Sequence, residues 1–347
     1  MRFYLVTSCL FIISPAAFAA SDYNDPSHYK QRAIPRNQFN NGNANAGSNG
    51  HIIKENPKRY NSNNDYDLNV GIEGGYRTSQ LKWSIGIDGI IPYTISNLEW
   101  ENNNGYEIQP SVEYTQKTGS LKGLNLQASV NKSITTSGEN QDSDYDLTGE
   151  ISRSNNSSDA GHSEGFSASI GYAFNFTGKR KQDVRRFTAL VGYAMQNQKF
   201  VLRDGYQTIP ATGPIAGLRS SYDVELSMPF VGADYYTQFG DVHSLKISGK
   251  VSKASYNGTG HWNLRSDLAH PDSFAHDADG WAFLLGAKYG WNFYPNLKLT
   301  LAANLNYFKA TDGDDTVYTS SGTVLNAALR KVRYASTDYL AGLNYSF

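Results

Sequence analysis

Apolar residues recur at every second position through most of this 347-residue chain, from about residue 66 to the last residue. The runs are rich in tyrosine, phenylalanine and tryptophan. The clearest of them cover residues 106–114, 124–130, 166–176, 187–195, 245–251, 281–293, 297–307 and 339–347. Side chains of a β-strand point alternately to two faces, so this period predicts strands with one apolar face and one polar face.

The segments between these runs alternate in length. Short connections at 116–123, 177–186, 237–243 and 294–296 alternate with long polar ones at about 132–163, 199–220, 257–279 and 309–333. A transmembrane barrel has brief turns at one end and long loops at the other. A soluble sandwich or propeller, the competing all-β fold, gives no reason for this sorting. We therefore predict an all-β chain, a transmembrane antiparallel up-and-down β-barrel over residues 66–347.

The number of strands depends on how residues 66–92 are interpreted. Leu68, Val70 and Ile72 occupy even positions, whereas Leu81 and Trp83 occupy odd ones. A bulge or bend near residues 76–79 would allow one long first strand despite this shift, which gives ten strands. Treating the two halves as separate strands, with a further strand near residues 94–100, gives twelve. We expect ten.

The first 19 residues are typical of an export signal. Arg2 supplies the positive end, residues 5–13 form an apolar core, and Ala17-Phe18-Ala19 is a small-x-small cleavage site. The single cysteine lies inside this signal, so we expect no disulfide and no thiol chemistry in the mature chain. Residues 20–65 are rich in Asn, Ser and Gly without periodicity, which predicts a flexible polar N-terminal segment.

Composition agrees with a membrane barrel and excludes other classes. The chain is 13% aromatic, yet its mean hydropathy is −0.51, as expected when lipid-facing residues are apolar and inward-facing ones are polar. After residue 20 no apolar run reaches the length of about 18 residues that a membrane-spanning helix needs. A formal net charge of −1 gives no argument for a nucleic-acid partner.

Chemistry-bearing side chains gather in the long connections. Asp142 and Asp144 are spaced to point to the same side of a strand end, where two carboxyl groups could share a proton or hold a water molecule. An Asp-His pair opposite them could supply a general base. The alternative is that acidic loop residues are simply solvated, as Asp312-Gly313-Asp314-Asp315 illustrates. No complete calcium loop is present, and we expect neither a metal site nor a cofactor.

Several short motifs resemble, in the same order, landmarks of the omptins, ten-stranded outer-membrane aspartyl-type proteases. They are residues 96–100 (SNLEW), the Asp142-x-Asp144-Tyr145 segment, Gly192-Tyr193, residues 228–232 (MPFVG) and the segment around His270. The chain also resembles the outer-membrane porin family of a chlamydia-like symbiont, with residues 262–267 and 276–280 as shared landmarks.

The omptin resemblance implies a mechanism in which an aspartate pair and an Asp-His pair activate water against a peptide bond. Asp142 and Asp144 match the first pair, and His270 matches the histidine. The aspartate that should stand two residues before His270 is replaced by Leu268, and the nearest acid is Asp267, three residues before. The candidate catalytic residues are therefore Asp142, Asp144, Asp267 and His270, in an altered site.

Three functions remain open at this point: an omptin-like endopeptidase, a narrow porin-like channel, and a non-enzymatic adhesin or structural barrel. Ten strands enclose little more than their own side chains, which disfavours a large pore. The terminal Phe347 matches the C-terminal signal of outer-membrane proteins, by resemblance the one that the barrel-assembly machinery reads. We expect an outer-membrane location with extracellular loops and periplasmic termini. The expected partners are outer-membrane lipid, that machinery during biogenesis, and an extracellular peptide or host-surface ligand, with no nucleic acid.

Overall fold

A computed structural model describes residues 64–87, 93–177, 184–240 and 242–347. The export signal and residues 20–63 of the N-terminal segment lie outside the described residues. None of the residues described forms a helix long and apolar enough to cross a membrane. The strands are β1 (Tyr66–Ile87), β2 (Tyr93–Gln116), β3 (Leu124–Asp146), β4 (Gly149–Ser157), β5 (His162–Thr177), β6 (Val184–Ile209), β7 (Gly213–Phe239), β8 (His243–His261), β9 (Phe274–Tyr294), β10 (Leu297–Ala310), β11 (Gly313–Tyr318) and β12 (Val324–Ser346).

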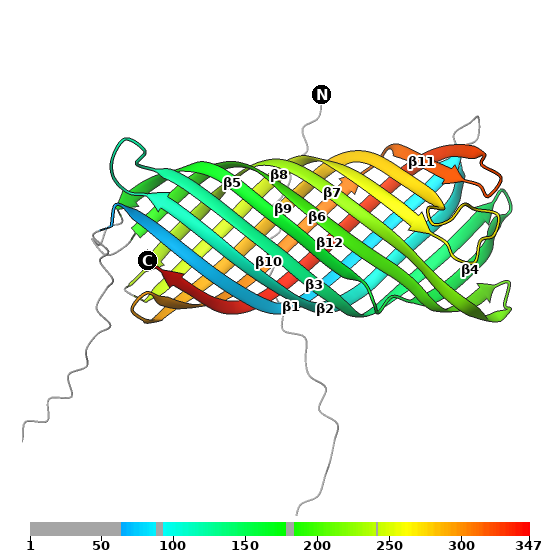
Figure 1. Ribbon diagram of the computed structural model, residues 1–347, viewed down its shortest axis with the longest axis horizontal. Helices are drawn as coiled ribbons and strands as arrows, with labels where there is room; N and C mark the ends of the chain where they lie inside the picture. Colours follow the sequence, from blue (N-terminus) through cyan, green and yellow to red (C-terminus); the bar gives the residue numbers. More distant parts are fainter. Residues whose placement is uncertain (1–63, 88–92, 178–183, 241) are drawn as a thin grey trace, which may run out of the picture. The chain divides into compact units, whose positions relative to one another are not determined.

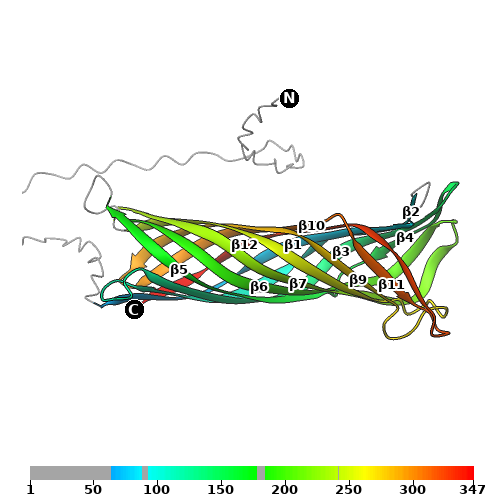
Figure 2. The same cartoon turned by 90° about the horizontal axis from the view of Figure 1, so that it is seen from above.

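The strands form one closed antiparallel ring (Figures 1 and 2). Sequence neighbours pair around the sheet, and β1 closes the ring by pairing with β12. β4 and β5 both lie between β3 and β6, while β10 and β11 both lie between β9 and β12. The twelve segments thus occupy ten positions, which confirms the predicted ten-stranded up-and-down barrel. We call the end where β1 begins and β12 stops the termini end, and the opposite end the loop end.

The long connections predicted from the sequence are mostly strand. Residues 199–209 continue β6, residues 213–220 begin β7, and only residues 210–212 join them. Residues 132–146 likewise belong to β3. The barrel wall therefore continues well beyond the apolar runs. The sequence prediction missed this extension because the outer face there is polar, so the segments lack the lipid-facing apolar pattern.

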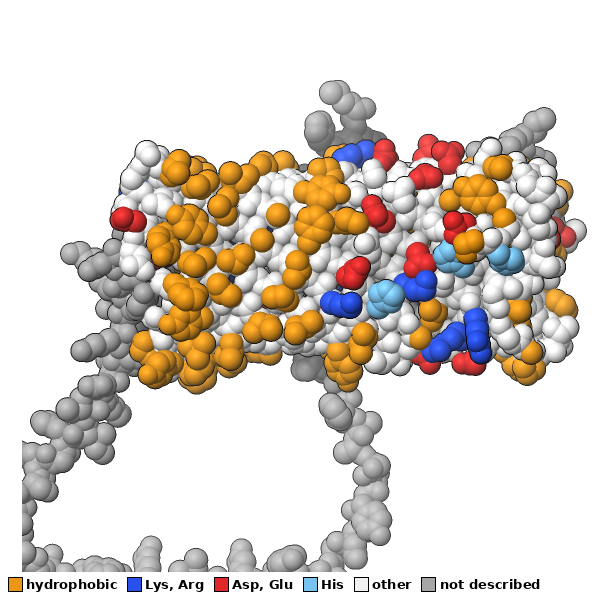
Figure 3. Space-filling view, in the orientation of Figure 1, with side chains coloured by type: hydrophobic (Ala, Val, Ile, Leu, Met, Phe, Trp, Pro, Cys, Tyr) orange, Lys and Arg blue, Asp and Glu red, His pale blue; other side chains and the backbone are white. Residues whose placement is uncertain are grey.

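The outer wall carries two zones of different chemistry. Hydrophobic side chains cover the part near the termini end, whereas charged and histidine side chains gather on the part near the loop end (Figure 3). Exposed apolar residues of the first zone include Ile72, Ile108, Ile170, Val191, Val231, Ile247, Leu285 and Leu301. An outward-facing apolar band is the lipid-contacting surface of membrane barrels.

The first strand shows why the apolar alternation changes phase. Val70 and Ile72 are exposed on the outer wall, while Leu81 and Trp83 are buried inside. The pairing of β1 with β12 is regular from Asn69 to Ser84, so odd-numbered residues point inward along this whole stretch. The phase changes because the inward side chains change from polar to apolar, and not because the strand turns over.

The predicted bulge lies in β2 rather than in β1. Ser79 pairs with Asn103 and Leu81 pairs with Trp100, so β2 has one residue more than β1 between these pairs. Asn102, inside the bulge, has a φ of 51°. The bulge changes which residues of β2 face inward. Glu107, on its termini-end side, and Trp100, on its loop-end side, are therefore both buried in the barrel.

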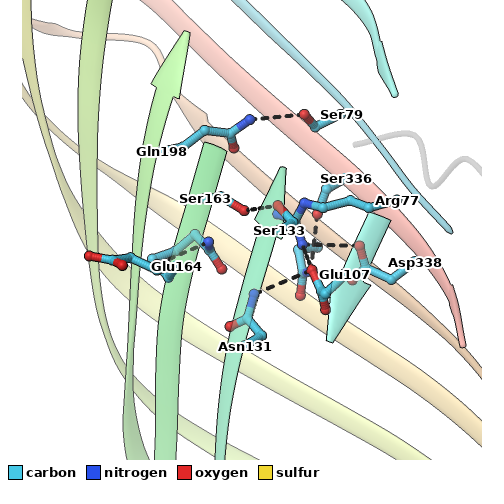
Figure 4. A network of polar contacts seen from close by, with 12 residues as sticks. Arg77, Ser79, Glu107, Asn131, Ser133, Ser163, Glu164, Gln198, Ser336 and Asp338 are labelled. Carbon is cyan, nitrogen blue, oxygen red and sulfur yellow. Dashed lines mark hydrogen bonds and ion pairs between the residues drawn. The ribbon is translucent and has the colours of Figure 1, made fainter. Parts of the chain in front are cut away.

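The middle of the lumen is closed by a polar network around Arg77 (Figure 4). Its guanidinium donates to Glu107 at 2.6 Å, to Asp338 at 3.0 Å and to the Tyr334 hydroxyl at 2.8 Å. These residues come from β1, β2 and β12, and all are buried. The buried charges are paired and hydrogen-bonded, as the interior of a barrel requires.

Towards the loop end the lumen is filled by apolar and aromatic side chains. Trp100 stacks on Tyr222, Tyr222 on Phe274, and Tyr256 on Phe308. The cluster also includes Leu81, Trp83, Leu98, Phe200, Leu202, Leu226, Met228, Leu329 and Val332. Apolar side chains on the inward faces of barrel strands pack like the core of a soluble protein. This part of the lumen is therefore filled and is not an aqueous channel, and we call the cluster the aromatic plug.

Candidate functional site

The aspartate pair lies at the loop end of β3, beyond the apolar band. Asp142 pairs with Leu98 of β2, and Asp144 pairs with Ser96. The two acids are two residues apart on a strand, so their side chains point to the same face. The structure thus brings Asp142 and Asp144 together.

The connection between β8 and β9, residues 262–273, lies close to this pair and is tied down by hydrogen bonds. Asn263 accepts from the backbone of Arg219 and the hydroxyl of Ser220. The backbone of Ser320 donates to the carbonyl of Asp267 at 2.9 Å. Trp262 packs edge-on against Phe274 with ring centroids 4.7 Å apart. The connection is therefore fixed to its neighbours on both sides and anchored to the aromatic plug.

Two side chains of this connection act on the aspartate pair. Trp262 and the charge of Arg265 favour the ionised form of Asp142, and Arg265 also favours the ionised form of Asp144. Ser96 of β2 also favours the ionised form of Asp144. The aspartate pair thus has its own donors and a cation close by.

Burial shifts the titration of both acids, and the charge of Asp144 adds to the shift of Asp142. Burial, together with the charge of Asp144, raises the pKa of Asp142 to about 7, against the lowering by Trp262 and Arg265. Burial also raises the pKa of Asp144, opposed by Ser96 and Arg265. Asp142 therefore keeps its proton to a higher pH than an ordinary aspartate does.

The structure places the other two predicted residues differently. Arg265 binds Asp267 through Nε at 2.8 Å and Nη2 at 2.7 Å, and this ion pair lowers the pKa of Asp267 to about 2. His270 lines a surface depression of about 560 Å³ with Asn263, Leu264, Ser266, Leu268, Ala269 and Ser320. Among the described contacts, the side-chain bonds of Asp267 go to Arg265 and not to His270.

A different histidine is part of a buried polar chain that sequence reasoning missed. His276 Nε2 of β9 lies 3.1 Å from Asp315 Oδ1 of β11, and His276 Nδ1 lies 2.7 Å from the Tyr222 hydroxyl. The Tyr222 and Tyr256 hydroxyls lie 2.6 Å apart. The four residues come from four strands distant in sequence, so local spacing carries no signal for them. This series of four polar side chains lies inside the aromatic plug.

The arrangement at the loop end can activate water. A carboxylate accepts a proton from water, and a neighbouring protonated carboxyl donates to a carbonyl oxygen. Because the pKa of Asp142 is about 7, its protonated and ionised forms are both available near neutral pH. Arg265 adds a positive charge close to the pair.

Comparison with known proteins agrees with the fold. The structure is similar to the outer-membrane protease OmpT from Escherichia coli, with a TM-score of 0.68, 14% identity, and coverage of 81% of this chain and 97% of that chain. It also matches the outer-membrane protein OprG from Pseudomonas aeruginosa at a TM-score of 0.29 and 11% identity, covering 81% and 95% of the two chains. No curated protein matches the sequence. A family model matches most of the chain: over residues 71–347 the protein belongs to the Protochlamydia outer membrane protein family.

Proposed function

We propose that this outer-membrane barrel is a surface endopeptidase whose chemistry is carried by Asp142 and Asp144, with the loop end outside the cell. One observation carries the proposal: the two carboxyl groups share one face at the barrel end, and the pKa of Asp142 is raised to about 7. Acid pairs that share a proton at working pH are the water-activating groups of aspartic proteases. The similarity in fold to OmpT, named as a protease, is consistent with this function.

The contacts of the two acids suggest separate roles. The Ser96 hydroxyl and the charge of Arg265 favour the ionised form of Asp144, which suits a general base. Burial and the charge of Asp144 favour the protonated form of Asp142, which suits a general acid. Asp144 would take a proton from water as the water oxygen attacks the peptide carbonyl carbon. At the same time Asp142 would donate its proton to the carbonyl oxygen. Asp144 would then pass its proton to the amine nitrogen as the C–N bond breaks, and Asp142 would take back a hydroxyl proton as the carbonyl re-forms.

This division of roles does not need a histidine. In the alternative mechanism His270 is the base and Asp267 orients it, but Asp267 is held by Arg265. The two mechanisms predict different mutants. In the first, only the aspartate pair is essential; in the second, His270→Ala abolishes activity as well.

The test is cleavage of a fluorogenic peptide library by the refolded full-length barrel, with and without lipopolysaccharide. We expect Asp144→Asn to reduce kcat/KM by about 10²-fold or more, the scale of general acid–base catalysis. Asp146→Asn is the matched control, because Asp146 is the next acid on the same strand and its described side-chain hydrogen bonds go to Thr148 in its own turn. The proposal fails if Asp144→Asn cleaves as fast as the wild type, or if no peptide is cleaved.

A second candidate is a non-enzymatic surface-binding barrel. One observation favours it: residues 262–273 are hydrogen-bonded to the neighbouring segments on both sides, and Trp262 of this connection acts on Asp142. A rim of this kind would present a fixed loop surface to a host ligand. The test is binding of the purified barrel to host cells or matrix. This candidate is supported if trimming residues 262–273 abolishes binding while Asp144→Asn and Asp146→Asn bind like the wild type.

A further inference from the structure

A second cavity opens at the opposite end of the barrel from Asp142 and Asp144. It has a volume of about 600 Å³ and is lined by inward side chains of the strands near the termini end, among them Ser129, Ser167, Arg186, Lys246, Lys250, Lys288 and Lys298. We call it the vestibule. The polar network at Arg77 and the aromatic plug lie between it and the loop end. The vestibule is therefore a blind cavity and not one arm of a pore.

The carboxylates in the vestibule wall are already bound. Glu113 accepts from Arg186 at 2.8 Å and from Lys246 at 2.9 Å. Asp234 also contacts Lys246, at 2.9 Å, and accepts from Gln127 at 2.8 Å. These contacts leave no spare negative charge on that side of the wall.

The third acid is bound in the same way. Glu73 contacts Lys288 at 2.8 Å and accepts from the Thr300 hydroxyl at 2.8 Å. Apart from the ion pair of Asp67 with Lys117 at the rim, three acids thus stand beside five cations along the inner wall: Arg186, Lys246, Lys250, Lys288 and Lys298. The inner wall carries an excess of positive charge.

The excess resides in two lysines. The described contacts of Lys250 include the Ser167 hydroxyl at 3.3 Å and the ring of Phe230, 4.4 Å from the ammonium nitrogen to the centroid. Lys298 lies 5.8 Å from the centroid of Tyr236. Neither forms an ion pair with a carboxylate among the described residues. An aromatic face attracts an ammonium group through its quadrupole but carries no net charge, so both lysines remain open to an anion.

The two lysines lie at different depths. Lys250 also lines the smaller cavity of about 160 Å³ beside Arg77 and Glu107, and it therefore lies at the floor of the vestibule. Lys298 lies near the mouth, where it shares the ring of Tyr236 with Arg186. Cations at the mouth attract an anion into a cavity whose low-dielectric walls concentrate the field, and Lys250 with the Ser167 hydroxyl can bind it at the floor.

We propose that the vestibule binds a small molecule with a phosphate or carboxylate group, held at the floor by Lys250. The chain's own N-terminal segment is a poor occupant, because residues 20–63 contain six Lys or Arg and only three Asp or Glu. At the rim Asp67 lies 3.0 Å from Lys117, and the terminal Phe347 is also part of the lining. Because Asp67 occupies Lys117 and adds negative charge at the rim, the mouth itself is not a second anion site. The proposal is independent of the endopeptidase site.

The test is isothermal titration calorimetry on the refolded full-length barrel, with inorganic phosphate and succinate as probes at constant ionic strength. We expect saturable binding of at least one probe, and the pair of titrations tells phosphate from carboxylate recognition. Lys250→Gln should weaken binding at least tenfold. Lys298→Gln should weaken it severalfold and reduce its dependence on salt, because its charge acts at the mouth.

Lys253→Gln is the matched control, since Lys253 is on the same strand and its side chain lies on the exposed outer face. It should bind like the wild type. Circular dichroism and heat-modifiability on gels establish that each variant has folded. Equal binding by wild type, Lys250→Gln and Lys298→Gln would overturn the proposal, as would the absence of saturable binding of either probe.

Discussion

Arg265 holds Asp267 with two hydrogen bonds, of 2.8 and 2.7 Å, within a single connection between β8 and β9. This pair changes how the loop end of the barrel can work. Asp267 is engaged by a cation, and that cation also acts on Asp142 and Asp144. Arg265 thus connects the loop acid to the strand acids.

Replacing Arg265 should move the titration of three carboxyl groups. In Arg265→Gln we expect the pKa of Asp267 to rise from about 2 towards its ordinary value, because its ion pair is lost. The pKa values of Asp142 and Asp144 should rise further, since Arg265 lowers both. If peptide cleavage is found, the acidic limb of the pH profile of kcat/KM should move to higher pH. An unchanged profile would show that Arg265 does not act on the pair.

Stability should depend on pH through Asp142. Its folded pKa of about 7 is above the unfolded value near 3.8, so the folded state binds the proton more tightly. The contribution is therefore fully present below about pH 4 and is lost as the pH rises to about 7. Asp142→Asn cannot ionise, and between pH 4 and 8 its free energy of unfolding should fall less than that of the wild type. Urea unfolding in detergent, followed by circular dichroism, measures the free energy of unfolding of both proteins at each pH. If the two free energies change with pH in parallel, the raised pKa of Asp142 is contradicted.

The tyrosine pair should contribute unequally to the stability of the plug. Tyr222→Phe removes the hydroxyl that contacts both Tyr256 and His276, whereas Tyr256→Phe removes a hydroxyl whose described partner is Tyr222 alone. A buried polar group left without its partner costs about 1–3 kcal/mol. We expect Tyr222→Phe to lower the free energy of unfolding by about that much, and Tyr256→Phe by less.

Tyr345→Phe is the control for these variants, because Tyr345 is exposed on the outer wall. It should unfold like the wild type. Equal losses in Tyr222→Phe and Tyr345→Phe would mean that the hydroxyl contacts inside the plug contribute nothing.

Ion conduction should be absent. The lumen is closed by side chains of the strands themselves, including Trp100, Tyr222 and Phe308. In planar bilayers we expect no steady current from the wild type, and none from a variant in which residues 262–273 are replaced by a short Gly-Ser linker. Steady single-channel steps from the wild type would contradict the plug and revive a porin-like role.

The sequence predicted the barrel well because its information is local. Alternation over about ten residues specifies each strand, and the separation of Asp142 from Asp144 specifies a shared face. Where inward residues change from polar to apolar, as between Arg77 and Leu81, the same alternation misleads, because period two alone does not tell the inside from the outside. The strands are longer than predicted for another reason: beyond the apolar runs the outer face is polar (Figure 3), so the segments lack the lipid-facing apolar pattern.

The rest of the site depends on contacts between distant segments. No spacing rule brings Trp262 to Asp142, or Asp315 to His276, since each pair joins different strands or loops whose approach is set by the closed ring. Asp267 and His270 are close in sequence, yet the loop directs Asp267 to Arg265.

The most direct test of the account is the titration of the carboxyl groups themselves. Carbon-13 NMR of the barrel labelled at the aspartate side-chain carboxyls, compared with Asp142→Asn, reports the pKa of each resolved group. The account predicts one aspartate that titrates near pH 7 in the wild type and is missing in Asp142→Asn. If the resonance assigned to Asp142 titrates below about pH 5, near the ordinary aspartate range, the raised pKa of Asp142 and the function built on it are wrong.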